Sequence, residues 1–282
     1  MKNLLKKFLN LEKNKPTYDF IKGLSAKTLI NKRNISFKVF RNIVMPVIQG
    51  ITYNKLNFDI EKGYAFYVEG ENQYLMFRYK KYCYTFWGSI KRMPKFHPYE
   101  CETLNQYSGF FFANKMPVDI HSKDERKIYS NQELEMCGNC SKEIFKSWWS
   151  GNKPWYDSVL KYIEEQKNST FKKDGYHTMW NQISECYKEK MNWCCENCKI
   201  DLSGREDRIY LHTHHINGNI RDNRISNFKA LCLLCHSIEH KERLIKGLGI
   251  LEVEHFINLY RANLPSNNLS LFDSITNERY KL

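Results

Sequence analysis

Four cysteines in the C-terminal half form two C-x-x-C pairs, a pattern typical of metal ligands. The pairs are Cys195 with Cys198 and Cys232 with Cys235, and 33 residues separate them. Two such pairs can place four thiolates around one tetrahedral Zn²⁺ in a closed, structural site, which would add folding free energy to a small module. The alternative is that these cysteines pack as small apolar residues. Cys194 competes with its neighbour, but only Cys195 keeps the two-residue gap to Cys198.

Histidines lie between and after these pairs. A strand is predicted around His214 and His215, whose side chains then point to opposite faces. The second cysteine pair leads into a predicted helix that carries His236 and His240, four residues apart and therefore on one face. Neutral imidazole can bind a divalent metal or act as a general base near neutral pH. His212 shares the strand face of His214; we interpret it as a polar strand residue, with a substrate contact or a rival ligand as alternatives.

Residues 176–245 resemble the HNH (ββα-metal) endonuclease family, in its zinc-binding branch. The two framing C-x-x-C pairs match that branch. Besides these cysteines, the shared positions agree with the family in residue type and order, and they are His214, His215, Asn227, His236 and His240.

The resemblance implies a role for each of these residues. His215 would be the general base that takes a proton from the attacking water, and Asn227 would orient the base or add to the metal shell. The catalytic divalent ion would be held by His214, His236 and His240. Many family members have Asp at the position of His214, and three imidazoles favour Zn²⁺ or Ni²⁺ over Mg²⁺. Because the ligand set departs from the family at His214, the catalytic ion could be Mg²⁺, Mn²⁺, Ni²⁺ or Zn²⁺.

A second set of ligand types lies in the N-terminal half. His97, Cys101, Cys137 and Cys140 could form another zinc site with one histidine and three cysteines. This pattern also resembles an N-terminal module of some bacterial HNH proteins. The alternative has His97 at the surface and the cysteines packed, and Cys83 could replace either ligand of the first pair, His97 or Cys101.

The predicted elements indicate an α+β fold. An N-terminal helical arm precedes an antiparallel-sheet domain, with strands predicted from Tyr64 and from Tyr74. The zinc-stapled ββα-metal (HNH) module follows, and the polar tail after Pro265 is expected to be loosely held. The predicted division is a recognition or partner-docking domain at 1–145, a linker at 146–175, the HNH nuclease domain at 176–247, and a C-terminal helix and tail at 248–282.

Aromatic and basic residues interleave from Arg78 to Trp87. Such a run could stack bases on a sheet. Aromatic strands are more often core, however, and we predict that these side chains are buried.

The charge of the chain favours a polyanionic partner. Its formal net charge is +13, and residues 1–41 carry eleven Lys and Arg against two acidic residues. The alternative is a solvated face that only keeps the protein in solution. No uncharged apolar run approaches the roughly 18 residues that a membrane span needs, so no membrane partner is expected. The leucines of the N-terminus are interrupted by lysines, which predicts a cytoplasmic protein with reduced cysteines.

These observations predict a metal-dependent endonuclease that hydrolyses phosphodiester bonds, with double-stranded DNA as the expected partner and antiviral defence or restriction as the expected context. One alternative is a non-catalytic, zinc-dependent DNA-binding regulator, and another is an RNA-cleaving effector. His215 distinguishes an enzyme from a regulator, because no structural zinc site needs it.

Overall fold

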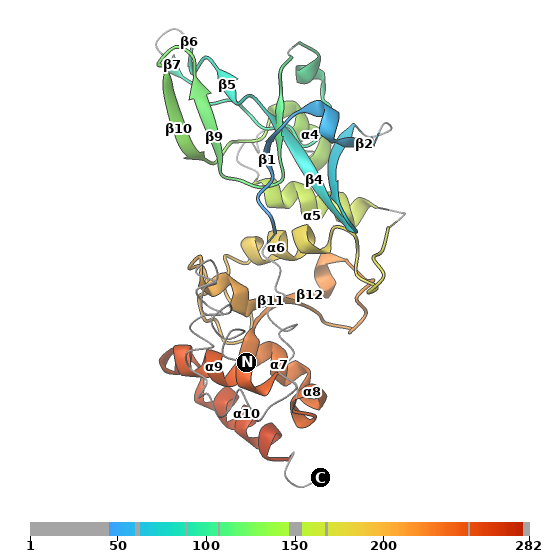
Figure 1. The fold of residues 1–282 in the computed structure, drawn as a ribbon, viewed down its shortest axis with the longest axis vertical. Coiled ribbons are helices and arrows are strands. Elements are labelled where there is room, and N and C mark those ends of the chain that lie inside the picture. Colours follow the sequence, from blue (N-terminus) through green and yellow to red (C-terminus); the bar gives the residue numbers. More distant parts are fainter. Residues whose placement is uncertain are drawn as a thin grey trace, which may run out of the picture. The chain divides into compact units, whose positions relative to one another are not determined.

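The computed structural model describes residues 45–59, 63–87, 90–106, 108–146, 154–166, 169–247 and 249–278. The predicted N-terminal arm lies outside them. The fold is mixed α+β and its sheets are mainly antiparallel, as the sequence predicts. Contacts divide the described chain into two compact units (Figure 1). We call residues 45–190 and 215–228 the sheet unit, and residues 191–214 and 229–278 the helical unit; the domain limits derived from the sequence stay a prediction.

A five-stranded sheet organises the sheet unit. Its strand order is β1-β8-β4-β3-β2, and each neighbouring pair is antiparallel. The predicted strands from Tyr64 and Tyr74 are confirmed, and the turn between them contains Gly70 at a positive φ of 58°. The strands are β1 (Gln49–Ile51), β2 (Asn57–Asp59), β3 (Tyr64–Glu69), β4 (Asn72–Tyr79) and β8 (Phe111–Ala113), with a 3₁₀ turn at η2 (Tyr53–Lys55).

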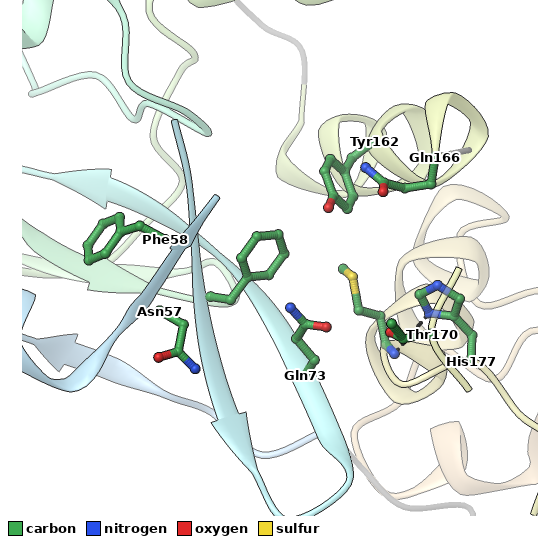
Figure 2. Close-up of a pocket in the computed structure, with 9 residues that line it drawn as sticks. Asn57, Phe58, Gln73, Tyr162, Gln166, Thr170 and His177 are labelled. Carbon is green, nitrogen blue, oxygen red and sulfur yellow. Dashed lines mark hydrogen bonds between the residues drawn. The ribbon is translucent and has the colours of Figure 1, made fainter. Parts of the chain in front are cut away.

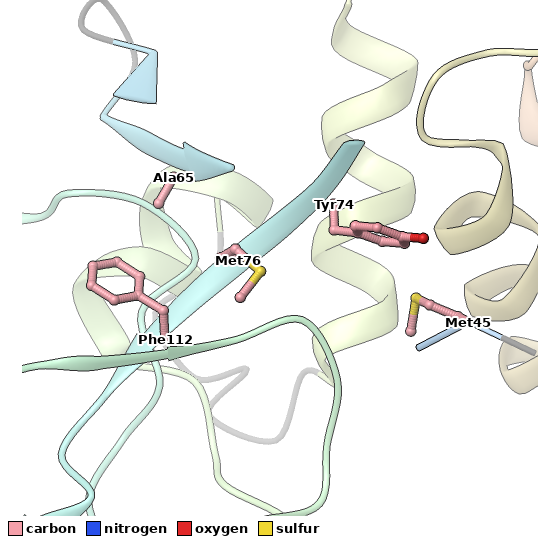
Figure 3. Packing of buried hydrophobic residues seen from close by; sticks show 5 residues of the cluster. All are labelled: Met45, Ala65, Tyr74, Met76 and Phe112. Atoms are coloured by element: carbon pink, nitrogen blue, oxygen red, sulfur yellow. The ribbon is translucent and has the colours of Figure 1, made fainter. Parts of the chain in front are cut away.

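Strand β4 is buried on both faces from Tyr74 to Tyr79, which explains its nearly continuous apolar sequence. A core cluster includes Tyr74 and Met76; its members, drawn in Figure 3, are Met45, Ala65, Tyr74, Met76 and Phe112. Helices α5 (Trp155–Glu165) and α6 (Trp180–Lys190) pack together, and α6 also contacts β4.

Two buried side chains fasten these helices to the sheet. The Gln182 amide accepts a hydrogen bond from the Leu75 backbone N–H at 2.7 Å and donates to the Leu75 carbonyl at 2.9 Å. The Trp155 ring lies 5.0 Å from that of Phe77. Helix α5, inside the segment predicted as a linker, is therefore part of the packed sheet unit.

A second sheet in the same unit has the order β10-β9-β5. Its strands are β5 (Tyr82–Cys83), β9 (Val118–Ser122) and β10 (Lys127–Gln132), and a separate pair joins β6 (Phe86–Trp87) to β7 (Ile90–Lys91). Tyr79 is buried as predicted, but Tyr82, Tyr84 and Phe86 are exposed, so the predicted core role is wrong for these three. Strands β5 and β6 are only two residues long, and within the described residues the rings on and between them stay open to solvent. The unit also contains η3 (Glu102–Gln106), α4 (Gly138–Phe145) and η5 (Ile225–Asn227).

Strands β11 (Leu211–His215) and β12 (Phe228–Cys232) pair, and β11 confirms the strand predicted around His214 and His215. The chain passes from one unit to the other within these two strands. The remaining elements of the helical unit are η4 (Asp207–Tyr210), α7 (Leu233–Glu239), α8 (Lys241–Ile245), α9 (Ile250–Tyr260), η6 (Arg261–Asn263) and α10 (Ser266–Glu278).

The expectation of a loosely held tail after Pro265 is wrong. Helix α10 contacts α7 and α8 and buries Phe272 and Ile275. Pro265 begins this helix instead of ending the previous one, because its carbonyl accepts the first hydrogen bonds, from the backbone of Asn268 and Leu269. Within the described residues, every helix is too short or too polar to cross a membrane.

Candidate metal centres and catalytic residues

The two C-x-x-C pairs converge in the helical unit. The sulfur atoms of Cys195, Cys198, Cys232 and Cys235 all lie within 4.8 Å of one another. Cys195, Cys232 and Cys235 are almost fully buried, and the Sγ atoms of Cys198 and Cys232 are 3.6 Å apart. Hydrogen bonds from the neighbouring thiols lower the pKa of Cys195 far below its usual range. This cluster could hold a zinc ion, since four sulfur donors at such separations match a tetrahedral thiolate site.

Backbone and side-chain contacts shape this cluster. The turn after Cys195 is closed by the Lys199 N–H, which donates to the Cys195 carbonyl at 2.9 Å, and Lys199 has a positive φ of 64°. The side-chain amide of Asn268, from α10, donates to Cys235 Sγ at 3.2 Å. Asn268 was not predicted from the sequence, because it lies outside every ligand motif.

Three histidines form a second group in the helical unit. One ring nitrogen each from His214 on β11, His236 on α7 and His240 at the end of α7 lies within 4.8 Å of the other two. The rings meet nearly edge to face, with centroid separations of 5.4 Å (His214–His236), 5.0 Å (His214–His240) and 4.8 Å (His236–His240). Three imidazole nitrogens converge on one point, as ligands of a single ion do.

The charge state of these histidines suits a metal. Burial lowers the pKa of His236 well below its ordinary value, and the neighbouring histidines lower it further. Burial and Arg243 also lower the pKa of His240. Neutral imidazole is the form that binds a metal, so both rings are ready to act as ligands at neutral pH. His212 stacks on His236 with centroids 4.9 Å apart and lies outside the converging set.

His215, the next residue on β11 after His214, belongs to the sheet unit. Exposure alternates along the strand, so His214 is half-buried and His215 is 5% exposed. Its ring stacks on Trp180 of α6 with centroids 4.6 Å apart and meets the edge of Phe228 at 5.3 Å. Burial lowers the pKa of His215, partly offset by the Asn223 amide and the Asp222 carboxylate. Among the described residues, no group makes a well-formed hydrogen bond to its buried Nε2 atom.

Asn227 fastens the loop that follows His215. Its side-chain oxygen accepts the Asn217 N–H at 3.0 Å, and its amide nitrogen donates to the Asn217 side chain at 3.0 Å and to the Asp222 carbonyl at 2.9 Å. The Gly218 N–H closes the turn onto the His215 carbonyl at 2.9 Å. Asn227 is thus occupied in fixing the backbone beside His215. Trp180, which holds the ring, was missed by sequence reasoning.

The ligand set predicted in the N-terminal half also comes together, in the sheet unit. The donor atoms of His97, Cys101, Cys137 and Cys140 lie within 4.8 Å of one another and all four residues are buried. His97 Nδ1 is 3.2 Å from Cys101 Sγ and 3.7 Å from Cys140 Sγ. The alternative of a surface histidine is wrong, because His97 is only 6% exposed. Cys83, on β5, is not part of the cluster.

A cavity of about 270 Å³ lies in the sheet unit, and none of these ligands is among its lining residues (Figure 2). Amides and rings line it, including Gln73, Tyr162 and Gln166, and no described lining residue carries a formal charge. Burial lowers the pKa of its one histidine, His177, to about 4, so that ring is neutral. Its full lining is Asn57, Phe58, Phe66, Gln73, Tyr162, Gln166, Thr170, His177 and Met179.

Comparison with known proteins gives one informative similarity. The chain is 27% identical to Zorya protein ZorE of Escherichia coli over 185 residues, which cover 57% of this chain and 48% of that protein. The chain therefore spans about half the length of the curated relative it matches. No family model matches the chain, and no solved structure matches it.

Proposed function

We propose that this protein is a metal-dependent endonuclease of the HNH type that hydrolyses phosphodiester bonds in DNA. The proposal rests above all on three imidazole nitrogens within 4.8 Å of one another on His214, His236 and His240. Structural zinc sites need no free histidine beside them, whereas a hydrolase needs a base. His215, adjacent to His214 in the chain and on the opposite strand face, is a candidate for that base.

The three histidines fit a divalent cation, because they are half-buried and close enough to share one ion, and burial favours the neutral form of His236 and His240. An all-imidazole donor set favours Zn²⁺ or Ni²⁺ over the oxygen-seeking Mg²⁺, with Mn²⁺ between them. When bound, such an ion would neutralise charge at the scissile phosphate and stabilise the leaving 3′ oxygen. The two cysteine-containing clusters are proposed as structural zinc sites, one in each unit.

His215 would take a proton from the attacking water at Nε2. Its lowered pKa keeps the ring neutral, and therefore able to accept that proton, throughout the physiological range. Stacking against Trp180 restricts rotation of the ring, and the Asn227 hydrogen bonds restrict the following backbone. Both residues would act by positioning the base.

Double-stranded DNA is the proposed substrate, in keeping with the net charge of +13. Antiviral defence is the proposed context, and the similarity to a Zorya protein supports it. A nuclease needs His215 as its general base, whereas a DNA-binding regulator does not. Substitution of His215 therefore distinguishes the two hypotheses.

The decisive experiment compares wild type with His215→Ala on plasmid DNA, single-stranded DNA and RNA, each with Mg²⁺, Mn²⁺, Ni²⁺ or Zn²⁺ added. We expect cutting of plasmid by wild type, a loss of about 10²-fold or more in the variant, and unchanged zinc content and melting temperature. His255→Ala, in α9 and outside all three clusters, is the matched control and should cut normally. Equal cutting by His215→Ala would refute the mechanism. Cutting of RNA alone would favour the effector hypothesis, and no cutting by wild type with any metal would favour the regulator.

A further inference from the structure

A row of side chains crosses the outer face of the three-stranded sheet in the sheet unit. Tyr82 on β5 is the register partner of His121 on β9, and His121 is the partner of Ile128 on β10. Partners in register share a face of a sheet, so these three side chains stand side by side. The rings of Tyr82 and His121 have centroids 4.8 Å apart.

This face is apolar and open to solvent. Tyr82 is 46% exposed, Ile128 54%, and Tyr84, two residues beyond Tyr82, 72%. The opposite side of β9 carries the buried residues Val118 and Ile120, which hold the sheet on its core. Large exposed side chains gathered on one small sheet and just beyond its edge strand indicate a binding surface.

Lysines stand beside the exposed rings. The Lys81 ammonium lies 5.8 Å from the ring centroid of Tyr82 and 5.8 Å from that of Phe111, and the Lys123 ammonium lies 5.8 Å from that of Tyr84. Neither lysine forms an ion pair with a described carboxylate. Their charge therefore stays available to a ligand.

Two of the acidic groups nearby, Asp119 and Asp124, accept backbone N–H groups, and Glu125 accepts the Thr85 and Tyr129 hydroxyls. Asp124 accepts the N–H groups of Thr85 at 3.0 Å and Phe86 at 2.7 Å, and Asp119 accepts that of Asn131 at 3.0 Å. The Asp124 bonds hold the loop after β5 against the turn between β9 and β10, and the Asp119 bond joins β9 to β10. Carboxylates satisfied in this way compete less for the lysines, so the face remains suited to an anion.

We propose that this face binds single-stranded nucleic acid. We name it the stacking surface and define it by Lys81, Tyr82, Tyr84, His121, Lys123 and Ile128. Exposed rings can stack on bases only where the bases are unpaired, and a lysine beside each ring meets the phosphate that every base brings with it. A purely apolar protein partner would leave both ammonium groups without a counter-charge. The inference goes beyond the proposed function, since it adds a surface for unpaired strands to a nuclease whose proposed substrate is duplex DNA.

The test measures binding without cutting, in the full-length His215→Ala protein with EDTA absent and no added divalent metal. Fluorescence anisotropy follows a labelled oligothymidine and the matching labelled duplex. Tyr84→Ser and Tyr82→Ser should each weaken oligothymidine binding about fivefold or more while leaving its salt dependence unchanged. Tyr84→Phe should restore binding, because the ring is kept. Lys81→Gln and Lys123→Gln should each flatten the log–log salt slope by about 0.7.

Val68→Ser is the matched control, because Val68 is 45% exposed and lies on the other sheet of the same unit. It should bind as the parent does. Unchanged oligothymidine affinity in both tyrosine variants, at an unchanged melting temperature, would overturn the inference. So would an equal loss of duplex affinity, which would make the surface a general cationic patch. Because binding is read without cleavage, failure of the nuclease mechanism would not alter either result.

Discussion

The imidazole of His215 is enclosed by rings, and this sets the pH at which it can act. Burial lowers its pKa from the ordinary value, so the neutral base persists to a lower pH than an exposed histidine allows. Cleavage that needs the neutral form should therefore hold its rate as the pH falls to about 6.5, and decline only below it. The measurement is kcat/KM against pH, with metal content recorded at each point. An acid limb at or above 6.5 would contradict this assignment.

Trp180 supplies much of that enclosure, since it stacks on the ring at 4.6 Å. Trp180→Ala should admit water to the imidazole and move the acid limb upward towards 6.5, with a fall in kcat from the loss of positioning. Trp180→Phe keeps an aromatic face and should restore most of the profile. A uniform fall in activity with no shift of the limb would mean that Trp180 serves only the fold.

Two adjacent cysteines provide a test of the thiolate cluster. Cys195 is fully buried among the four sulfurs, whereas Cys194 is half-exposed, its thiol donates to the Asn192 carbonyl at 3.5 Å, and it lies outside the set. Cys195→Ser should lose one zinc per chain and strongly destabilise the helical unit, because structural zinc contributes roughly 10 kcal/mol or more to folding. Cys194→Ser should retain both the zinc content and the stability of the wild type. Mass spectrometry measures the zinc content of each variant, and thermal unfolding measures its stability. Equal zinc content in the two variants would refute the proposed thiolate zinc site.

The ligand groups could be predicted from the sequence because their spacing is local: C-x-x-C turns and histidines four apart fix geometry within a few residues. The roles of Trp180 and Asn268 could not be predicted from the sequence. Each reaches its partner, His215 or Cys235, from an element more than thirty residues away in sequence, and only the packing of those elements brings them together.

The packing of helix α10 could not be predicted from its sequence. Its composition is polar, yet Phe272 is 4% exposed while its neighbour Leu271 is 46% exposed. Phe272→Ala should therefore cost about 3 to 5 kcal/mol of unfolding free energy through the cavity it leaves. Leu271→Ala, the matched control, should cost less than about 0.5 kcal/mol. Chemical denaturation checks both, and similar midpoints for the two variants would mean that α10 is not docked as described.

The strands from Tyr64 and Tyr74 could be predicted because one or both faces of each are buried, which gives their sequences a nearly continuous apolar and aromatic character. The segment around Tyr82 and Tyr84 is equally aromatic, yet both of these rings are exposed. Propensity reports that a residue suits a pleated strand, and whether that strand is covered depends on the rest of the fold.

At the scale of the whole molecule, each unit carries its own cysteine-containing cluster. Cys137→Ser in the sheet unit should lose one zinc per chain and lower the melting temperature, because Cys137 is buried in its cluster and begins α4. Cys83→Ser, in the same unit but outside the cluster, should keep the wild-type zinc content. If Cys137→Ser keeps full zinc, the second site is only a packed group of cysteines and a histidine.

The basic residues of the N-terminal arm give the last prediction. Residues 1–41 carry eleven Lys and Arg against two acidic residues, and none of the proposed ligands or catalytic groups lies among them. If these cations meet phosphates, each neutralised phosphate contributes about 0.9 to the log–log salt slope of duplex binding. Deletion of residues 1–41 should then flatten that slope in proportion to the number of phosphates that the arm neutralises, while kcat at saturating DNA and low salt stays close to wild type. An unchanged slope would make the arm a solvated face, and a collapse of kcat at saturation would mean that the arm acts in the site itself.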